Sequence, residues 1–121
     1  MIKRPLHPRF RDPVITGKKT TTIRDKPWPV GVPIMLYNWT GAPYRSKQSD
    51  VAAVIVTNAV EIEITRNALG IGYWEPGTDV FLDLWAGEGF ESQNDMDSWF
   101  KEVIKPGQSV KKHIMRLSLS P

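Results

Sequence analysis

The sequence predicts an α+β domain in which mostly antiparallel strands carry helices on one side. Three strand-like segments of β-branched and apolar residues, 32–39, 51–57 and 60–64, follow one another with only loops between them. Such an order favours antiparallel neighbours. Helical apolar spacing occurs at 80–104, and another strand-like segment, 110–119, follows it. We therefore expect the two late helices to cover one side of the sheet.

The bulk composition is that of one globular domain. The chain has 121 residues, of which 40% are hydrophobic and 24% are charged, which is ordinary for a folded protein with its own core. It has no cysteine, so disulfides and thiolate metal sites are excluded. The longest apolar run, 51–56, is too short to span a bilayer, and no apolar stretch follows the charged N-terminus. We expect a single domain over residues 1–121, in the cytoplasm and without a membrane partner.

Capping residues predict the helices. Asp12-Pro13 is typical of a helix start, and Gly17 is typical of its end one or two turns later. Thr78 predicts the start of a second helix, whose apolar spacing continues to Trp85. A third helix is expected from Ser92 or Asn94. Its apolar stripe consists of Met96, Trp99, Phe100, Val103 and Ile104.

Alternation and composition predict the strands and loops. Segment 20–24 predicts a short strand, and the apolar run 51–57 predicts a buried central strand. Val and Ile alternate with Glu in 60–64, which indicates a separate, half-exposed strand. Residues 40–50 and the Gly/Pro-containing segment 67–77 are expected to form loops.

The net charge of +3 conceals a strong asymmetry. Residues 1–26 alone have a net charge of +6, whereas residues 75–102 contain eight acids and one base. The basic residues are Lys3, Arg4, Arg9, Arg11, Lys18, Lys19, Arg24 and Lys26. This segment either binds a polyanion such as RNA or docks on the acidic helices and neutralises them. The sequence alone favours neither interpretation.

The segment Gly17–Arg24 contains two lysines, three threonines and an arginine. A strand period of two places Thr22 and Arg24 on one face, and Lys19 lies in the turn before it. A threonine hydroxyl becomes a nucleophile when a base takes its proton, and a lysine acts as such a base when burial or a nearby cation lowers its pKa. The alternative is that the threonines only favour a strand and the lysines are solvated.

Other candidate residues lie in loops. Glu88 stands between two glycines, which either aim its carboxylate at a ligand or merely end a helix beside a solvated acid. Trp28 and Trp74 lie near Pro or Gly and either stack on a base or pack, half exposed, at a rim. His7 and His113 lack metal-ligand spacing, so we expect no metal site.

Three separated motifs together resemble the ASCH domain. The first is Phe10-Arg11 followed by Ile15-x-Gly17-x-Lys19-Thr20-x-Thr22-Ile23-Arg24. The second is Gly31 with the apolar strand after it, and the third is Trp85-Ala86-Gly87-Glu88-Gly89-Phe90, followed by an aromatic helix and Pro106-Gly107. The match spans residues 8 to 119. It implies a small PUA-like, mostly antiparallel β-barrel with helices covering one side.

The variant of the motif implies an enzyme. The common ASCH motif is G-x-K-x-x-E-x-R, and Thr22 occupies its glutamate position. This is similar to bacterial amidohydrolases that remove acetate from N(4)-acetylcytidine without a cofactor. The resemblance implies Lys19 as base, Thr22 as nucleophile and Glu88 as acid and orienting group, with Arg24 binding substrate.

Other members of the family imply alternatives, namely an RNA-binding module without hydrolysis or, with less support, a ribonuclease. The expected partner is therefore a nucleoside or RNA. The loops 40–50 and 70–77 are additions to the family pattern and are expected to reshape the mouth of the pocket.

Overall fold

The structure is a computed structural model that describes residues 1–120. The strands are β1 (Ile2–Pro5), β2 (Thr21–Arg24), β3 (Pro33–Trp39), β4 (Gln48–Asn67), β5 (Gly70–Trp74) and β6 (Ser109–Leu119). The helices are the 3₁₀ helix η1 (Pro8–Phe10), α1 (Arg11–Ile15), α2 (Trp85–Glu88) and α3 (Gln93–Lys101). None of the helices in these residues has the length and apolar character required to span a membrane.

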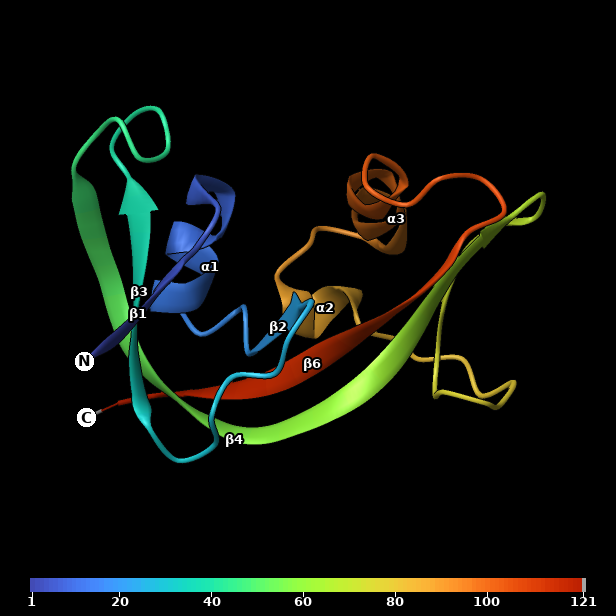
Figure 1. Ribbon diagram of the computed structural model, residues 1–121, viewed down its shortest axis with the longest axis horizontal. Helices are drawn as coiled ribbons and strands as arrows, with labels where there is room; N and C mark the ends of the chain where they lie inside the picture. Colours follow the sequence, from blue (N-terminus) through green and yellow to red (C-terminus); the bar gives the residue numbers. More distant parts are fainter. Residues whose placement is uncertain (121) are drawn as a thin grey trace.

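The six strands form one sheet in the order β1-β3-β4-β6-β2, and β5 pairs with β4 beside this path. All pairs are antiparallel except β1 with β3. The long strands β4 and β6 curve together, and the three α-helices lie on the concave side of the curve (Figure 1). The predicted α+β class with mostly antiparallel strands is therefore confirmed. The sheet is not closed into the expected β-barrel, however, because its end strands β1 and β2 do not pair with each other in the described part of the chain.

The predicted strands 51–57 and 60–64 are one continuous strand, β4. A bulge between Val56 and Asn58 shifts the pairing with β6. Thr57 is the extra residue, and the ladder continues through Asn58 and Ala59, where a gap between two strands was expected. The expected loop 40–50 is correspondingly shorter, because β4 begins at Gln48.

Three other elements differ from the prediction. Strand β1 was not predicted because its sequence, Ile2-Lys3-Arg4-Pro5, has no alternation of apolar and polar residues. Strand β5 occupies part of the expected loop 67–77 and forms a hairpin with β4. The helix expected after Thr78 is absent, because Phe81 forms a β-bridge with Trp74 and thus extends this segment along β5. Helical structure begins only at Trp85, with the single turn of α2.

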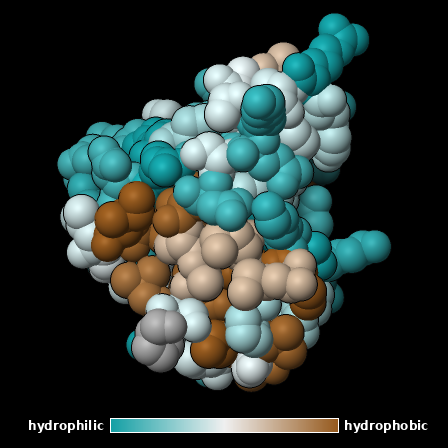
Figure 2. Space-filling view, turned by 90° about the vertical axis from the view of Figure 1, so that its left-hand side faces the viewer, coloured by the Kyte–Doolittle hydropathy of each residue, from teal (hydrophilic) through white to brown (hydrophobic). Residues whose placement is uncertain are grey.

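The signals at the end of α1 and the start of α3 are followed, whereas the predicted start of α1 is wrong. This helix begins at Arg11, its N-cap is Phe10 without a side-chain cap hydrogen bond, and Asp12 lies inside the first turn. Gly17 adopts the left-handed conformation, with a φ of 80°, after the C-cap of α1, as its position predicts. Ser92 caps α3 and accepts a hydrogen bond from the Asp95 amide. The inner side of α3 buries Met96 and Phe100 against the sheet core. Hydrophobic residues also gather on the surface at the end of the sheet that carries both termini (Figure 2).

Substitutions at two residues of β4 test which part of this strand contributes to the hydrophobic core. Ile62 is fully buried, whereas Val60, two residues earlier, is half exposed. We expect Ile62→Ala to lower the free energy of unfolding by about 2–5 kcal/mol, because it leaves a cavity. Val60→Ala should lower it by less than about 1 kcal/mol. Urea unfolding of both variants measures the difference, and equal losses would contradict this assignment of the core.

Candidate functional site

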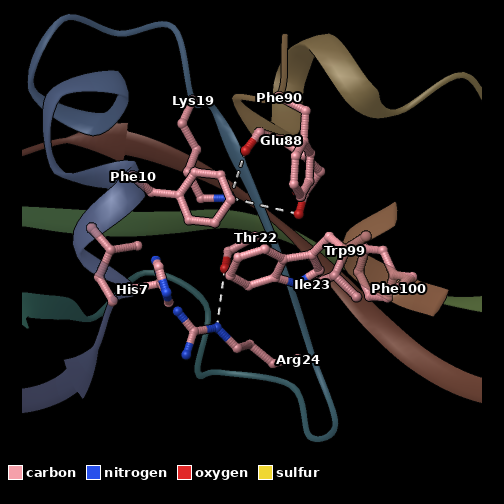
Figure 3. Close-up of a pocket in the computed structure, with 11 residues that line it drawn as sticks. His7, Phe10, Lys19, Thr22, Ile23, Arg24, Glu88, Phe90, Trp99 and Phe100 are labelled. Carbon is pink, nitrogen blue, oxygen red and sulfur yellow. Dashed lines mark hydrogen bonds and ion pairs between the residues drawn. The ribbon is translucent and has the colours of Figure 1, made fainter. Parts of the chain in front are cut away.

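A cavity of about 180 Å³ lies between β2, the N-terminal segment and the helices (Figure 3). It contains four of the residues singled out by the sequence, Lys19, Thr22, Arg24 and Glu88. Aromatic and apolar side chains complete its wall, namely Leu6, Phe10, Ile23, Phe90, Trp99 and Phe100, together with His7. The cavity thus combines a few charged groups with largely apolar walls, which is typical of a small-molecule site.

Lys19 and Glu88 form a buried pair of opposite charges. Their side chains are only 3% and 4% exposed, and Lys19 Nζ lies 3.6 Å from Glu88 Oε1. The same Nζ donates a hydrogen bond to the Glu88 backbone carbonyl at 2.9 Å. It also lies 4.5 Å from the centre of the Phe10 ring, where the ring face attracts a cation. Lys19 is therefore fixed from three directions, and its position in the cavity is well defined.

The environment of Lys19 lowers its pKa. Burial is the largest cause, because it penalises the ammonium form, and the positive charge of Arg24 acts in the same direction. The charge of Glu88 and its hydrogen bonding oppose the shift but do not cancel it. A larger fraction of Lys19 is thus neutral at a given pH than for a solvated lysine. A neutral lysine is able to accept a proton.

Thr22 and Arg24 share a face of β2, as the period of two predicts. Arg24 Nε donates a hydrogen bond of 3.0 Å to Thr22 Oγ1. This bond occupies the hydroxyl oxygen as an acceptor and leaves the hydroxyl proton free to be donated. Because the bond comes from a cation, it stabilises negative charge that develops on the oxygen. Lys19 lines the same cavity, but no hydrogen bond joins its Nζ to Thr22 Oγ1 among the described residues; Figure 3 marks contacts from Lys19 to Glu88 and from Arg24 to Thr22.

Trp28 packs against Arg24 and does not line the cavity. Its side chain is buried, and the Arg24 guanidinium lies 4.6 Å from the centre of its ring. The ring supports Arg24 by a cation–π contact, and it has no free face on which a base could stack. The expectation of a half-exposed rim residue is therefore wrong for Trp28, because it belongs to the core.

Thr21 is a site residue that the sequence reasoning missed. Its hydroxyl donates a short hydrogen bond to Glu88 Oε2, so the carboxylate is held by Thr21 on one oxygen and faces Lys19 with the other. The period of two places Thr21 on the opposite face of β2 from Thr22. The available signal was the position of Thr21 at the first residue of the strand, where the neighbouring α2 is close enough to be reached.

Backbone contacts bring α2 to the start of β2. The Thr20 amide donates to the Gly87 carbonyl of α2 at 2.7 Å. On the other side, the Lys19 amide donates to the Pro13 carbonyl of α1 at 2.8 Å. Gly89 ends α2 in the left-handed conformation, with a φ of 88°. A Cβ on Gly89 would lie 3.0 Å from the Lys19 Cβ, so glycine is required here for conformation and for space. These contacts explain how the two glycines around Glu88 aim its carboxylate.

Trp74 and His113 lie away from the cavity. Trp74 is on β5 and donates from its indole nitrogen to Thr65 Oγ1 at 2.9 Å, so the structure does not bring it to the predicted site. His113 is on β6, and its Nδ1 lies 3.2 Å from the Asp25 carbonyl oxygen. His7 lines the cavity, but Nδ1 of its ring accepts from the Arg9 amide at 3.1 Å. His7 and His113 do not form a catalytic pair.

The basic N-terminal segment is partly neutralised by acids of the helical region. Arg9 pairs with Asp95, and Lys18 pairs with Glu91 at 2.8 Å, in addition to the pair between Lys19 and Glu88. Arg9 lowers the pKa of Asp95 through its hydrogen bond. Docking on the acidic helices therefore accounts for three of the basic side chains.

Comparison of the chain with protein-family models, with characterised proteins and with solved structures found no match.

Two glycines separate backbone strain from crowding at Lys19. Gly89 and Gly77 both have positive φ, but a Cβ on Gly77 would meet nothing within 4 Å. Each change to alanine should cost about 1–2 kcal/mol in strain. Gly89→Ala should cost more and should displace Lys19, because the added Cβ collides with it. We expect a larger drop in Tm for Gly89→Ala than for Gly77→Ala. A drop of the same size would show that Gly89 does not position Lys19.

Proposed function

We propose that the protein is an amide hydrolase that removes the acyl group from an N(4)-acylated cytosine nucleoside. The single observation that carries the proposal is the arrangement of Lys19, Thr22 and Arg24 in one cavity. A buried lysine with a lowered pKa lines the same cavity as a hydroxyl whose oxygen is already bonded to an arginine. Together these are the requirements for an activated oxygen nucleophile: a base, a free hydroxyl proton and stabilisation of the developing charge.

The proposed reaction has two steps. Thr22 Oγ1 attacks the carbonyl carbon of the acyl group while neutral Lys19 takes the hydroxyl proton. The bond from this carbon to N4 of cytosine then breaks, and the proton is returned to the departing amine through Glu88. The resulting acyl ester on Thr22 is hydrolysed by water, with Lys19 again as base, which releases the carboxylate and restores the hydroxyl. Glu88 stabilises the ammonium form of Lys19 between these transfers.

The walls of the cavity support an aromatic substrate. Phe10, Phe90 and Trp99 line it together, with ring centres 5.2 to 5.9 Å apart. A flat pyrimidine ring packs well against such faces. The volume of about 180 Å³ is below the range of roughly 300–1,000 Å³ that is typical of drug-sized ligands. The acyl group and the base are therefore the parts expected inside, with the sugar at the mouth.

The ASCH assignment belongs to the same proposal. The strongly curved, mostly antiparallel sheet with helices on its concave side supports it, whereas the sheet is not closed into the barrel that the resemblance implies. So does the placement of the motif residues Lys19, Thr22, Arg24 and Glu88 around one cavity. We propose on this basis that the fold is related to the PUA-like domains. We also propose that the protein acts in the cytoplasm, which its lack of cysteine favours.

Release of cytidine from N(4)-acetylcytidine tests the proposed activity. The wild-type protein should release it, and Thr22→Ala should lower kcat by at least about a thousandfold, because the nucleophile is lost. Lys19→Ala should lower kcat by about 10²–10⁴-fold, the usual effect of removing a general base. Thr20→Ala is the matched control, because Thr20 is an exposed hydroxyl of the same segment.

Two results would contradict the proposal. One is a wild-type protein that hydrolyses no member of a panel of acylated cytidines. The other is equal activity of the wild type, Thr22→Ala and Lys19→Ala, which would remove these residues from the mechanism. Thermal unfolding of each variant separates a lost function from a lost fold.

The pH dependence of kcat/KM tests the role of Lys19. Activity should rise with pH and level off, with a midpoint below the ordinary lysine pKa of 10.5, because the neutral form is the base. Arg24 lowers the pKa of Lys19 and Glu88 raises it. Arg24→Met should therefore move the midpoint to higher pH, and Glu88→Gln should move it to lower pH. Arg24→Lys keeps the charge and should keep the midpoint. If the midpoints of Arg24→Met and Glu88→Gln moved in the same direction, the assignment of Lys19 as the base would be refuted.

A further inference from the structure

A second hollow, of about 520 Å³, adjoins the catalytic cavity. Leu6, His7 and Arg24 line both, so a ligand in one is in reach of the other. The opposite side of the hollow includes Trp39, at the end of β3, and Tyr44, in the loop between β3 and β4. The proposed reaction uses neither aromatic residue.

The conformation of Tyr44 indicates a role beyond folding. Its side chain is 87% exposed, and, with a φ of 63°, it is the only non-glycine residue with positive φ in residues 1–120. Such a conformation is unfavourable for a bulky residue and is found at ligand sites when the surrounding structure holds it.

The loop around Tyr44 does hold it. The Thr40 amide donates to the Lys47 carbonyl at 2.8 Å, and Ser46 Oγ accepts from the Gly41 amide at 2.9 Å. The same hydroxyl donates to the Ala42 carbonyl at 2.9 Å. These contacts fix the loop, and the Tyr44 side chain remains largely exposed.

The two rings form an aromatic surface beside positive charge. The centres of Trp39 and Tyr44 are 5.2 Å apart, and their planes are inclined by 50°. Arg24 lies at the boundary with the cavity, and its Nη groups have no hydrogen-bond partner among the described residues. Arg45 and Lys47 belong to the same loop and form no ion pair within residues 1–120. Hydrophilic residues cover the upper part of this face (Figure 2), at the height at which Figure 1 shows the loop.

We infer that this hollow binds a second nucleobase, joined to the acylated cytidine by a phosphodiester. The base stacks on Trp39 and Tyr44, and the linking phosphate faces Arg24. Aromatic side chains beside cations are the usual means of binding single-stranded nucleic acid. The identity of the ligand in the first cavity rests on the proposed function, and the inference adds that the substrate is an RNA strand rather than a free nucleoside.

The test compares N(4)-acetylcytidine with an RNA trinucleotide that carries it at the central position. The variant is Tyr44→Gly, because glycine adopts the left-handed conformation freely and removes the ring without disturbing the loop. The wild type should prefer the trinucleotide. Tyr44→Gly should lower kcat/KM for it at least about fivefold, mainly through KM, and leave the value for the nucleoside within about twofold. Tyr44→Phe should retain the preference, as should Leu69→Ala, an exposed residue on the turn before β5.

A binding measurement separates this inference from the proposed hydrolysis. Fluorescence anisotropy of a labelled trinucleotide should show weaker binding to Tyr44→Gly than to wild type, by the same factor, whether or not the protein is active. Tyr44-dependent binding by a protein that hydrolyses neither substrate would uphold the nucleobase site and reject the hydrolase. Equal binding of the trinucleotide by wild type and Tyr44→Gly would overturn the inference. So would an equal loss of kcat/KM on the nucleoside and on the trinucleotide. A wild-type preference for a longer acyl chain, with no preference for the trinucleotide, would also overturn it and would assign the hollow to the acyl group.

Discussion

The buried pair of Lys19 and Glu88 is the interaction on which the site depends. It joins residues 69 positions apart and holds the turn before β2 against the end of α2. Removing two charges from water is costly, so such a pair is not by itself a source of stability. The cost is offset by the hydrogen bond from Nζ to the Glu88 carbonyl, by the Phe10 ring and by the Thr21 hydroxyl. The protein therefore maintains a lysine where its charged form is disfavoured.

This arrangement connects the fold to the chemistry. The curved sheet and its helices enclose the cavity, and enclosure lowers the pKa of Lys19. Strand geometry then places the Thr22 hydroxyl and Arg24 on the same side, and Trp28 supports Arg24 from behind. Each group supplies one requirement of the proposed acyl transfer. A solvated copy of the same residues would lack the shift in pKa and the fixed orientation of the hydroxyl.

Local patterns were sufficient to predict part of this structure. The period of two placed Thr22 with Arg24, Ser92 marked the start of α3, and the ASCH-like motif joined Lys19 to Glu88 before any contact between them was known. What local patterns did not predict depends on tertiary contacts. The segment after Thr78 has helical spacing, but the bridge from Phe81 to Trp74 holds it extended.

The missed features of the site have the same origin. The contact of Thr21 with Glu88 arises from the packing of α2 on β2 rather than from strand alternation. Trp28 belongs to the hydrophobic core, whose members come from several elements. The exposed ring of Tyr44 was not singled out, because nothing in a polar loop reveals a left-handed tyrosine. Residues fixed by the geometry of one element were predictable; of those fixed between elements, only the pair of Lys19 and Glu88 was predicted, through the ASCH-like motif.

The most direct test of the account is the titration of Lys19 itself. Nitrogen-15 NMR of the Lys19 side chain, assigned with Lys19→Arg, measures its pKa without reference to activity. The account predicts a pKa below the ordinary value of 10.5 and equal to the midpoint of the pH dependence of N(4)-acetylcytidine hydrolysis. A pKa of Lys19 at or above the ordinary value, or a midpoint unrelated to it, would contradict the account.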